Sequence, residues 1–145
     1  MAALFQFENH LHQLKAEIEA FPNDASLWMI PKGVSNSPGN LALHLAGNLQ
    51  YFIGALLGNT GYVRDRDLEF SLKGQSKEYV LEQIEKAHTV VHDTLSSMTE
   101  EQEKEIFPSD FKGKMVKVNV ALSHLLAHLA YHNGQINYLR RMLYV

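Results

Sequence analysis

Residues 123–136 read SHLLAHLAYHNGQI, and this segment is the most informative part of the chain. His128 and His132 are four residues apart, so on a helix they lie on one face, one turn above the other. This spacing lets two imidazoles reach one transition-metal ion, as they do in H-E-x-x-H helices. A third histidine, His44, stands alone in an apolar segment far upstream and could complete the site. The pattern favours a helical protein with a three-histidine metal centre.

A helical wheel places both histidines of the pair on the apolar side of their helix, with His124 at the edge of that side. The arc they share also contains Ala121, Leu125, Ile136 and Leu139. Burying an unpaired polar group costs about 1–3 kcal/mol, so inward histidines need partners. A metal ion would satisfy the ligating nitrogens directly. The alternative is a buried network of hydrogen-bonded core histidines.

His44 also faces the predicted core, and Asn48 follows it one helical turn later. Asn48 could hold a water or a substrate; alternatively, His44 and Asn48 bond each other or a backbone carbonyl. His88 and His92 are a second pair with a spacing of four. The wheel places His88 among apolar residues and His92 at the edge of that face. We therefore expect one packing histidine and one partly exposed histidine there, and not a second metal site.

The composition excludes several classes of protein. A net charge of −3 gives no basic surface for DNA or RNA. The absence of cysteine excludes disulfides, thiolate ligands and a cysteine nucleophile, so a metal would be held by nitrogen and oxygen atoms. The N-terminus lacks the basic and apolar regions of a signal peptide, and the expected location is the cytoplasm.

Apolar periodicity predicts four helices, at about residues 4–21, 38–58, 76–98 and 119–143, and no convincing strand. Ser37 and Pro38 are a typical N-cap and first helical residue for the second helix. Residues 59–75 are predicted as a charged connection. Extended, it reaches about 55 Å, enough to cross a helix of about 30 Å. We predict an all-α four-helix bundle that forms one domain, residues 1–145.

The second helix is apolar on nearly every side, so it must be covered on every side. Part of that cover could come from a second copy of the chain, which predicts a homodimer. Residues 41–58 are also slightly shorter than the roughly 20 residues that span a bilayer. They carry His44, Asn48 and Gln50. We interpret them as a buried core helix and expect no contact with a membrane.

Three segments resemble the DinB-like (DinB/YfiT) superfamily. Residues 124–136 match its last-helix signature H-x-x-x-H-x-x-x-H-x-G-Q-I, and residues 37–45, SPGNLALHL, match the start of its second helix. Residues 64–70, RDRDLEF, resemble its charged connection. The resemblance implies an up-down-down-up bundle with a long crossover between helices two and three, and it also implies homodimers. It further implies a divalent ion, usually zinc or nickel, at His44, His128 and His132, with His124 in a supporting position beside the ligands.

Characterised members of that superfamily include mycothiol-dependent maleylpyruvate isomerases and bacillithiol S-transferases. The resemblance therefore implies a metal-dependent enzyme with a small-molecule substrate, acting by thiol-dependent transfer or isomerisation. Asn48, Tyr131 and Gln135 are candidates for orienting ligands or substrate. The alternatives are a hydrolase using metal-bound hydroxide and a non-catalytic metal-binding or structural dimer. No inward Asp or Glu flanks His128 or His132 as a general base, which favours thiol chemistry.

Overall fold

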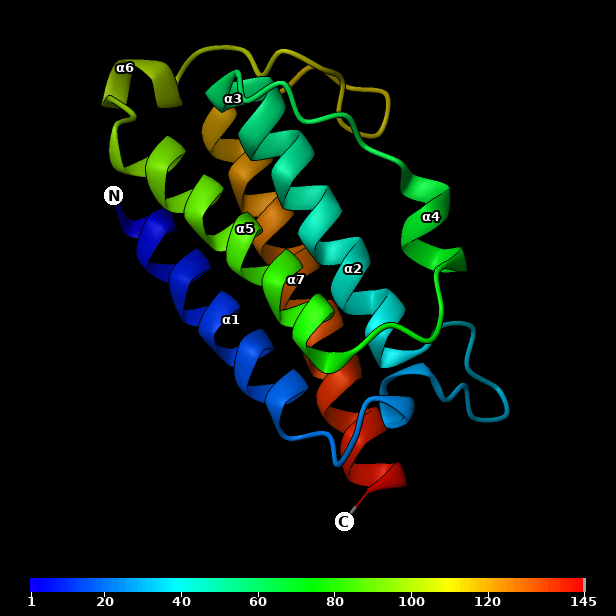
Figure 1. The fold of residues 1–145 in the computed structure, drawn as a ribbon. Helices are drawn as coiled ribbons and strands as arrows, with labels where there is room; N and C mark the ends of the chain where they lie inside the picture. Colours follow the sequence, from blue (N-terminus) through cyan, green and yellow to red (C-terminus); the bar gives the residue numbers. More distant parts are fainter. Residues whose placement is uncertain (145) are drawn as a thin grey trace.

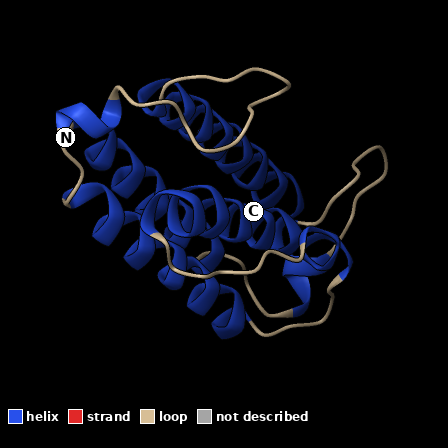
Figure 2. Ribbon diagram, turned by 90° about the horizontal axis from the view of Figure 1, so that it is seen from above, coloured by secondary structure: helices blue, strands red, loops and turns tan. Residues whose placement is uncertain are grey.

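A computed structural model of the protein describes residues 1–144, and its regular elements are helices (Figure 1). The four long helical segments are α1 (Ala2–Glu19), α2 (Pro38–Leu49), α5 (Lys77–Ser96) and α7 (Val118–Leu143). Within the described residues, strand-like pairing is limited to two isolated bridges, Ile106 with Lys117 and Phe111 with Lys114. The view from above shows helices joined by loops, and no sheet among residues 1–144 (Figure 2). The predicted all-α class is confirmed.

The long helices pack around one apolar core. α1 and α2 each contact both α5 and α7. In Figure 1, α1 and α7 run downward, whereas α2 and α5 run upward. The largest fully buried side chains include Phe7, Leu11, Leu14, Ile18, Leu45, Leu49, Ile53, Leu95 and Leu122. These residues come from all four helices, so each helix contributes its apolar face to the same core.

The helix ends follow local sequence rules. The Ser37 side chain accepts a hydrogen bond from the Asn40 backbone N–H, and Pro38 is the first residue of α2, as predicted. The same long helix continues through a π-helical turn, η2 (Gln50–Ala55), into α3 (Leu56–Gly58). Thr99 and Gln102 form a capping box at the start of α6 (Glu100–Glu103). Local capping chemistry therefore explains why these helices begin where they do.

One expectation about the loops is wrong. The segment predicted as a connection, residues 59–75, contains a short helix, α4 (Arg66–Ser71). The Asp65 side chain caps it by accepting a hydrogen bond from the Leu68 backbone N–H. α4 packs against α2, as Figure 1 shows. At six residues it is too short for hydrophobic periodicity to reveal.

α4 also explains how the apolar second helix is covered. Every residue of α2 is buried, and its cover comes from α4, α5, α7 and the 3-10 turn η1 (Ala25–Trp28) of the same chain. The segment Pro38–Gly58 is long and apolar enough to cross a membrane, yet 67% of its apolar 18-residue window is buried inside the protein. It is therefore the core helix that the sequence indicates. The apolar surface of α2 no longer requires a second subunit.

Glu17 links α1 to α7 at the edge of the core. Its carboxylate accepts hydrogen bonds from Asn137 Nδ2 at 2.6 Å and Arg140 Nε at 2.8 Å. Burial by itself raises the pKa of Glu17, but the hydrogen bonds from Arg140 and Asn137 outweigh it and lower that pKa below its ordinary value. The folded protein therefore binds this proton less tightly than the unfolded chain does.

We expect Glu17→Gln to lower the free energy of unfolding at pH 7 by about 1–3 kcal/mol. Because the pKa of Glu17 is lowered on folding, its contribution is present above about pH 4.5 and is lost as the pH falls through the folded-state pKa. The variant should therefore lose less stability than the wild type on acidification. Urea denaturation at pH 7 and pH 3 measures both effects. Glu19→Gln is the control, because Glu19 forms an exposed pair with Lys15 at 4.0 Å. If the wild type and Glu17→Gln lost the same amount of stability between pH 7 and pH 3, the prediction would be contradicted.

Candidate metal centre

Three histidine side chains meet between α2 and α7. His44 comes from the buried face of α2, and His128 and His132 lie one turn apart on α7. His128 Nε2 lies 3.1 Å from His44 Nε2 and 3.1 Å from His132 Nε2. One ligand atom from each of the three residues lies within 4.8 Å of the others. The structure thus brings together the three histidines that the sequence indicates.

Two of the three imidazole rings form a hydrogen bond through the nitrogen that faces away from the cluster. His44 Nδ1 donates to Glu69 Oε1 at 3.0 Å, and His132 Nδ1 donates to Gln135 Oε1 at 2.6 Å. A carboxylate and an amide oxygen are acceptors, so they fix the proton on Nδ1. The Nε2 lone pairs of both rings then point toward His128. This arrangement of the outer nitrogens is the one that metal-binding histidines use.

The convergent nitrogens fit a divalent ion. Two nitrogens bound tetrahedrally to zinc are about 3.3 Å apart, close to the 3.1 Å that separates two of these pairs. Without a cation, His128 Nε2–H could satisfy one facing lone pair, and the other would stay unpaired. His128 Nδ1 is buried with no hydrogen-bond partner among the described residues, and this is the same with or without a cation at Nε2. The unpaired lone pair is what distinguishes the two cases. The donor set therefore suits a metal better than a hydrogen-bonded network.

The electrostatics keep His128 and His132 neutral. Burial lowers the pKa of His128 to about 4, with further lowering from the nearby His132, His44, Arg64 and Arg66. Burial also lowers the pKa of His132. Neutral imidazole is the form that binds a metal, so at pH 7 few protons compete for these nitrogens.

Glu69 of α4 is the important residue that sequence analysis missed. Arg64 Nε donates to Glu69 Oε2 and Arg64 Nη2 to Glu69 Oε1, each at 2.9 Å. Burial raises the pKa of Glu69, but the hydrogen bonds from His44 and Arg64 outweigh it and lower that pKa overall. The result is a buried carboxylate that stays charged and anchors His44.

Asn40 and Gly47 place this carboxylate. Asn40 Nδ2 donates to the backbone carbonyl oxygens of Glu69 at 2.9 Å and Leu72 at 2.8 Å, which ties the end of α4 to the first turn of α2. Gly47 leaves room for the Glu69 carboxylate, which occupies the space where a Cβ at that position would lie. Phe70 of α4 covers the His44 ring, with the ring centroids 4.7 Å apart. Two features of the sequence could have indicated this contact: Asp65, which is a typical N-cap residue for α4, and the glycine at position 47, which leaves room for Glu69.

The remaining candidates divide into two groups. Gln135 contacts His132, and its Nε2 donates to the Tyr131 hydroxyl at 3.1 Å, so these two residues belong to the site. Asn48 is buried on α2, and its Oδ1 has no hydrogen-bond partner among the described residues. His124 lies outside the cluster: it is exposed and stacks on Phe111, with ring centroids 5.7 Å apart.

His88 and His92, the second pair with a spacing of four, lie away from the metal centre, where α5 packs against α1. His92 Nδ1 is 2.6 Å and His88 Nε2 is 3.7 Å from Glu8 Oε1. His88 is mostly buried, whereas His92 is about half exposed. The pair binds a carboxylate of α1, and within residues 1–144 the three-histidine geometry occurs at His44, His128 and His132.

Comparison with known proteins supports the architecture. The crystal structure of a DinB-like protein from Bacillus cereus ATCC 10987 superimposes with a TM-score of 0.73 at 17% sequence identity. The match covers 97% of this chain and 89% of that one, and it shows a shared fold. No curated protein matches the chain. The model of a family described as "Protein of unknown function (DUF1572)" matches residues 2–145. The chain therefore belongs to the DUF1572 family, and it has the fold of a DinB-like protein.

Proposed function

We propose that this protein is a divalent-metal-dependent enzyme on an up-down-down-up four-helix bundle, with His44, His128 and His132 as the ligands. One observation carries the proposal: the Nε2 atoms of the three histidines converge, while acceptors hold the Nδ1 atoms of His44 and His132. Three protein ligands that leave other positions open are typical of catalytic rather than structural sites. Imidazole ligands suit zinc or nickel.

A divalent ion at this site would supply Lewis-acid chemistry, because it lowers the pKa of a thiol or water that binds to it. The chain's own residues fix the ligands. The Glu69–Arg64 pair orients His44, and Gln135 orients His132. The Tyr131 hydroxyl accepts from Gln135, so its own proton is free to donate to a substrate.

Thiol-dependent transfer or isomerisation is the reaction that the site supports best. Hydrolysis commonly uses a general base near the metal. Glu69 is the buried acidic residue among the described residues, and both of its oxygens already accept hydrogen bonds from His44 or Arg64. Its pKa is lowered, which makes it a weak base. A thiol ionises far more readily than water, so a thiol bound to the ion would release its proton to solvent without a base from the chain.

The test is an activity assay on metal-loaded protein. Monochlorobimane serves as the electrophile, with several low-molecular-weight thiols as cosubstrates. We expect conjugation that requires both the metal and one of the thiols, and that stops when a chelator removes the metal. Ester or amide hydrolysis without thiol would favour the hydrolase instead. Metal binding without turnover in either assay would contradict the enzyme and leave a binding protein.

The cytoplasmic location and the homodimer stay predictions from the sequence and the family resemblance. Light scattering coupled to size-exclusion chromatography tests the second of them. A mass near 16.4 kDa, that of one chain, would contradict the dimer.

A further inference from the structure

A cavity of about 460 Å³ lies beside His132, between the loop that precedes α2 and the C-terminal half of α7. Its volume is within the range of small-molecule sites. His132 and Gln135 form part of its wall, so the cavity adjoins the metal centre. A molecule bound to the metal at one end could therefore extend along α7 into this space.

The lining of the cavity is uncharged. Val34 and Leu41 contribute from the loop and α2, and Tyr138, Leu139 and Met142 contribute from α7. The other lining side chains are neutral polar groups or glycine, with no Asp, Glu, Lys or Arg among them. A charged group placed there would lose hydration without gaining an ionic partner. An apolar group would instead leave water and contact aromatic and aliphatic side chains.

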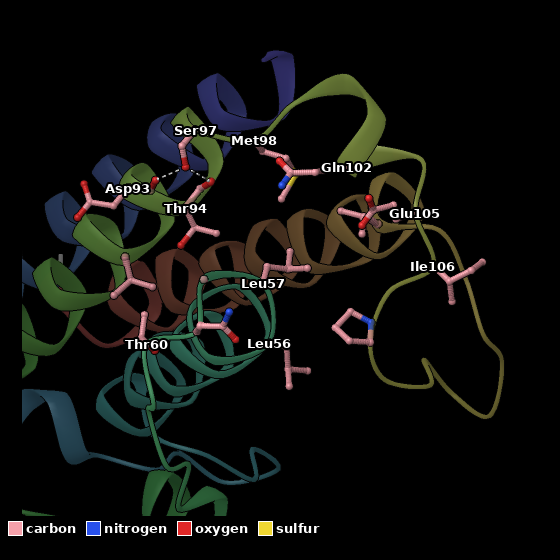
Figure 3. A pocket seen from close by; sticks show the side chains of 15 residues that line it. Leu56, Leu57, Thr60, Asp93, Thr94, Ser97, Met98, Gln102, Glu105 and Ile106 are labelled. Carbon is pink, nitrogen blue, oxygen red and sulfur yellow. Dashed lines mark hydrogen bonds between the residues drawn. The ribbon is translucent and has the colours of Figure 1, made fainter.

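Three other cavities measure about 480–510 Å³, and none of them is lined by a ligand histidine. The best-formed of these does not adjoin the metal centre. It measures about 510 Å³ and lies among α3, α5, α6 and the loop before α7 (Figure 3). Asp93, Thr94 and Glu105 line it, and none of the three ligand histidines does. The cavity at His132 is lined by a ligand histidine, so a substrate group held there would lie beside the metal centre.

We propose that the cavity beside His132 binds an uncharged aromatic or branched aliphatic group of the substrate while another part of the same molecule binds the metal. This inference rests on the proposed function, since it assumes a metal at His44, His128 and His132. It adds the chemical class of the substrate: a small electrophile with a neutral apolar group next to its reacting centre.

Hydroxamates test the inference without requiring turnover, because the same chelating group can carry different substituents. The protein is first loaded with zinc, and the zinc content is measured. Isothermal titration calorimetry then compares acetohydroxamate, benzohydroxamate and 4-carboxybenzohydroxamate. We expect benzohydroxamate to bind about tenfold or more tightly than acetohydroxamate. The added carboxylate of the third probe should remove most of that gain.

Exposed lining residues give variants that should still fold. Val34→Glu and Met142→Glu should each bring the affinity ratio of benzohydroxamate to acetohydroxamate close to one. Val120→Glu is the matched control, because Val120 is also an exposed apolar residue of α7 but does not line the cavity. It should keep the wild-type ratio.

The outcomes separate the two proposals. Zinc-loaded protein that binds acetohydroxamate and benzohydroxamate equally would overturn the substrate class and leave the metal site standing. The same holds if benzohydroxamate is preferred but the Val34 and Met142 variants keep that preference. Protein that takes up no divalent ion would overturn the proposed function and this inference together.

Discussion

The double variant His128→Ala/His132→Ala is expected to bind no divalent ion, whereas the wild type binds about one per chain. The variant removes two of the three converging nitrogens and leaves only His44. A single imidazole does not hold a metal against water at micromolar concentrations, because the chelate is lost. Elemental analysis of protein dialysed against zinc or nickel measures the difference.

A stability measurement gives a second, independent result. A ligand that binds the folded state alone stabilises it by about 2.7 kcal/mol at a concentration of 100 Kd. We expect that increase for wild-type protein with zinc or nickel, and none for the double variant. Thermal or urea unfolding with and without the metal measures it.

The chain supplies its own control for this experiment. His88 and His92 have the same spacing as the ligand pair but bind Glu8 at the seam between α5 and α1. His88→Ala/His92→Ala should keep one ion per chain and the full stabilisation by metal. A metal content that falls equally in both double variants would show adventitious binding by surface histidines and would contradict the site.

Gly47→Ala is expected to weaken metal binding by about 10–100-fold, although it changes no ligand. The added methyl group would occupy the place of the Glu69 carboxylate. Glu69 would then lose its hydrogen bonds to His44 and Arg64, and His44 would lose its orientation. Calorimetric titration with zinc measures the affinity.

The stability of the metal-free variant should fall as well. Alanine favours a helix over glycine by up to about 1 kcal/mol, but disrupting the buried carboxylate costs about 1–3 kcal/mol. Gly134→Ala is the matched control: Gly134 lies in α7, and a Cβ added there would meet no neighbouring side chain within 4 Å. That variant should gain stability and keep its metal affinity. Unchanged zinc affinity in Gly47→Ala would show that Glu69 does not position the ligand.

The apolar second helix has two explanations from the sequence alone: cover by the same chain or cover by a second subunit. An all-round apolar helix must be covered, and the sequence does not state by what. The cover assigned in part to a second subunit comes from α4 of the same chain, together with α5 and α7. α4 was missed because its six residues carry too little periodicity and many charges.

The sequence by itself determined the four long helices and the three histidines of the candidate site. Periodicity, the Ser37 cap and the spacing of His128 and His132 act over a few residues, so they can be read locally. Only the tertiary structure decided what surrounds these histidines. Glu69 contacts His44, which lies 25 positions away in the chain. Arg64, from the loop before α4, donates a hydrogen bond to Glu69. That contact depends on how α4 packs on α2, which hydrophobic spacing does not encode.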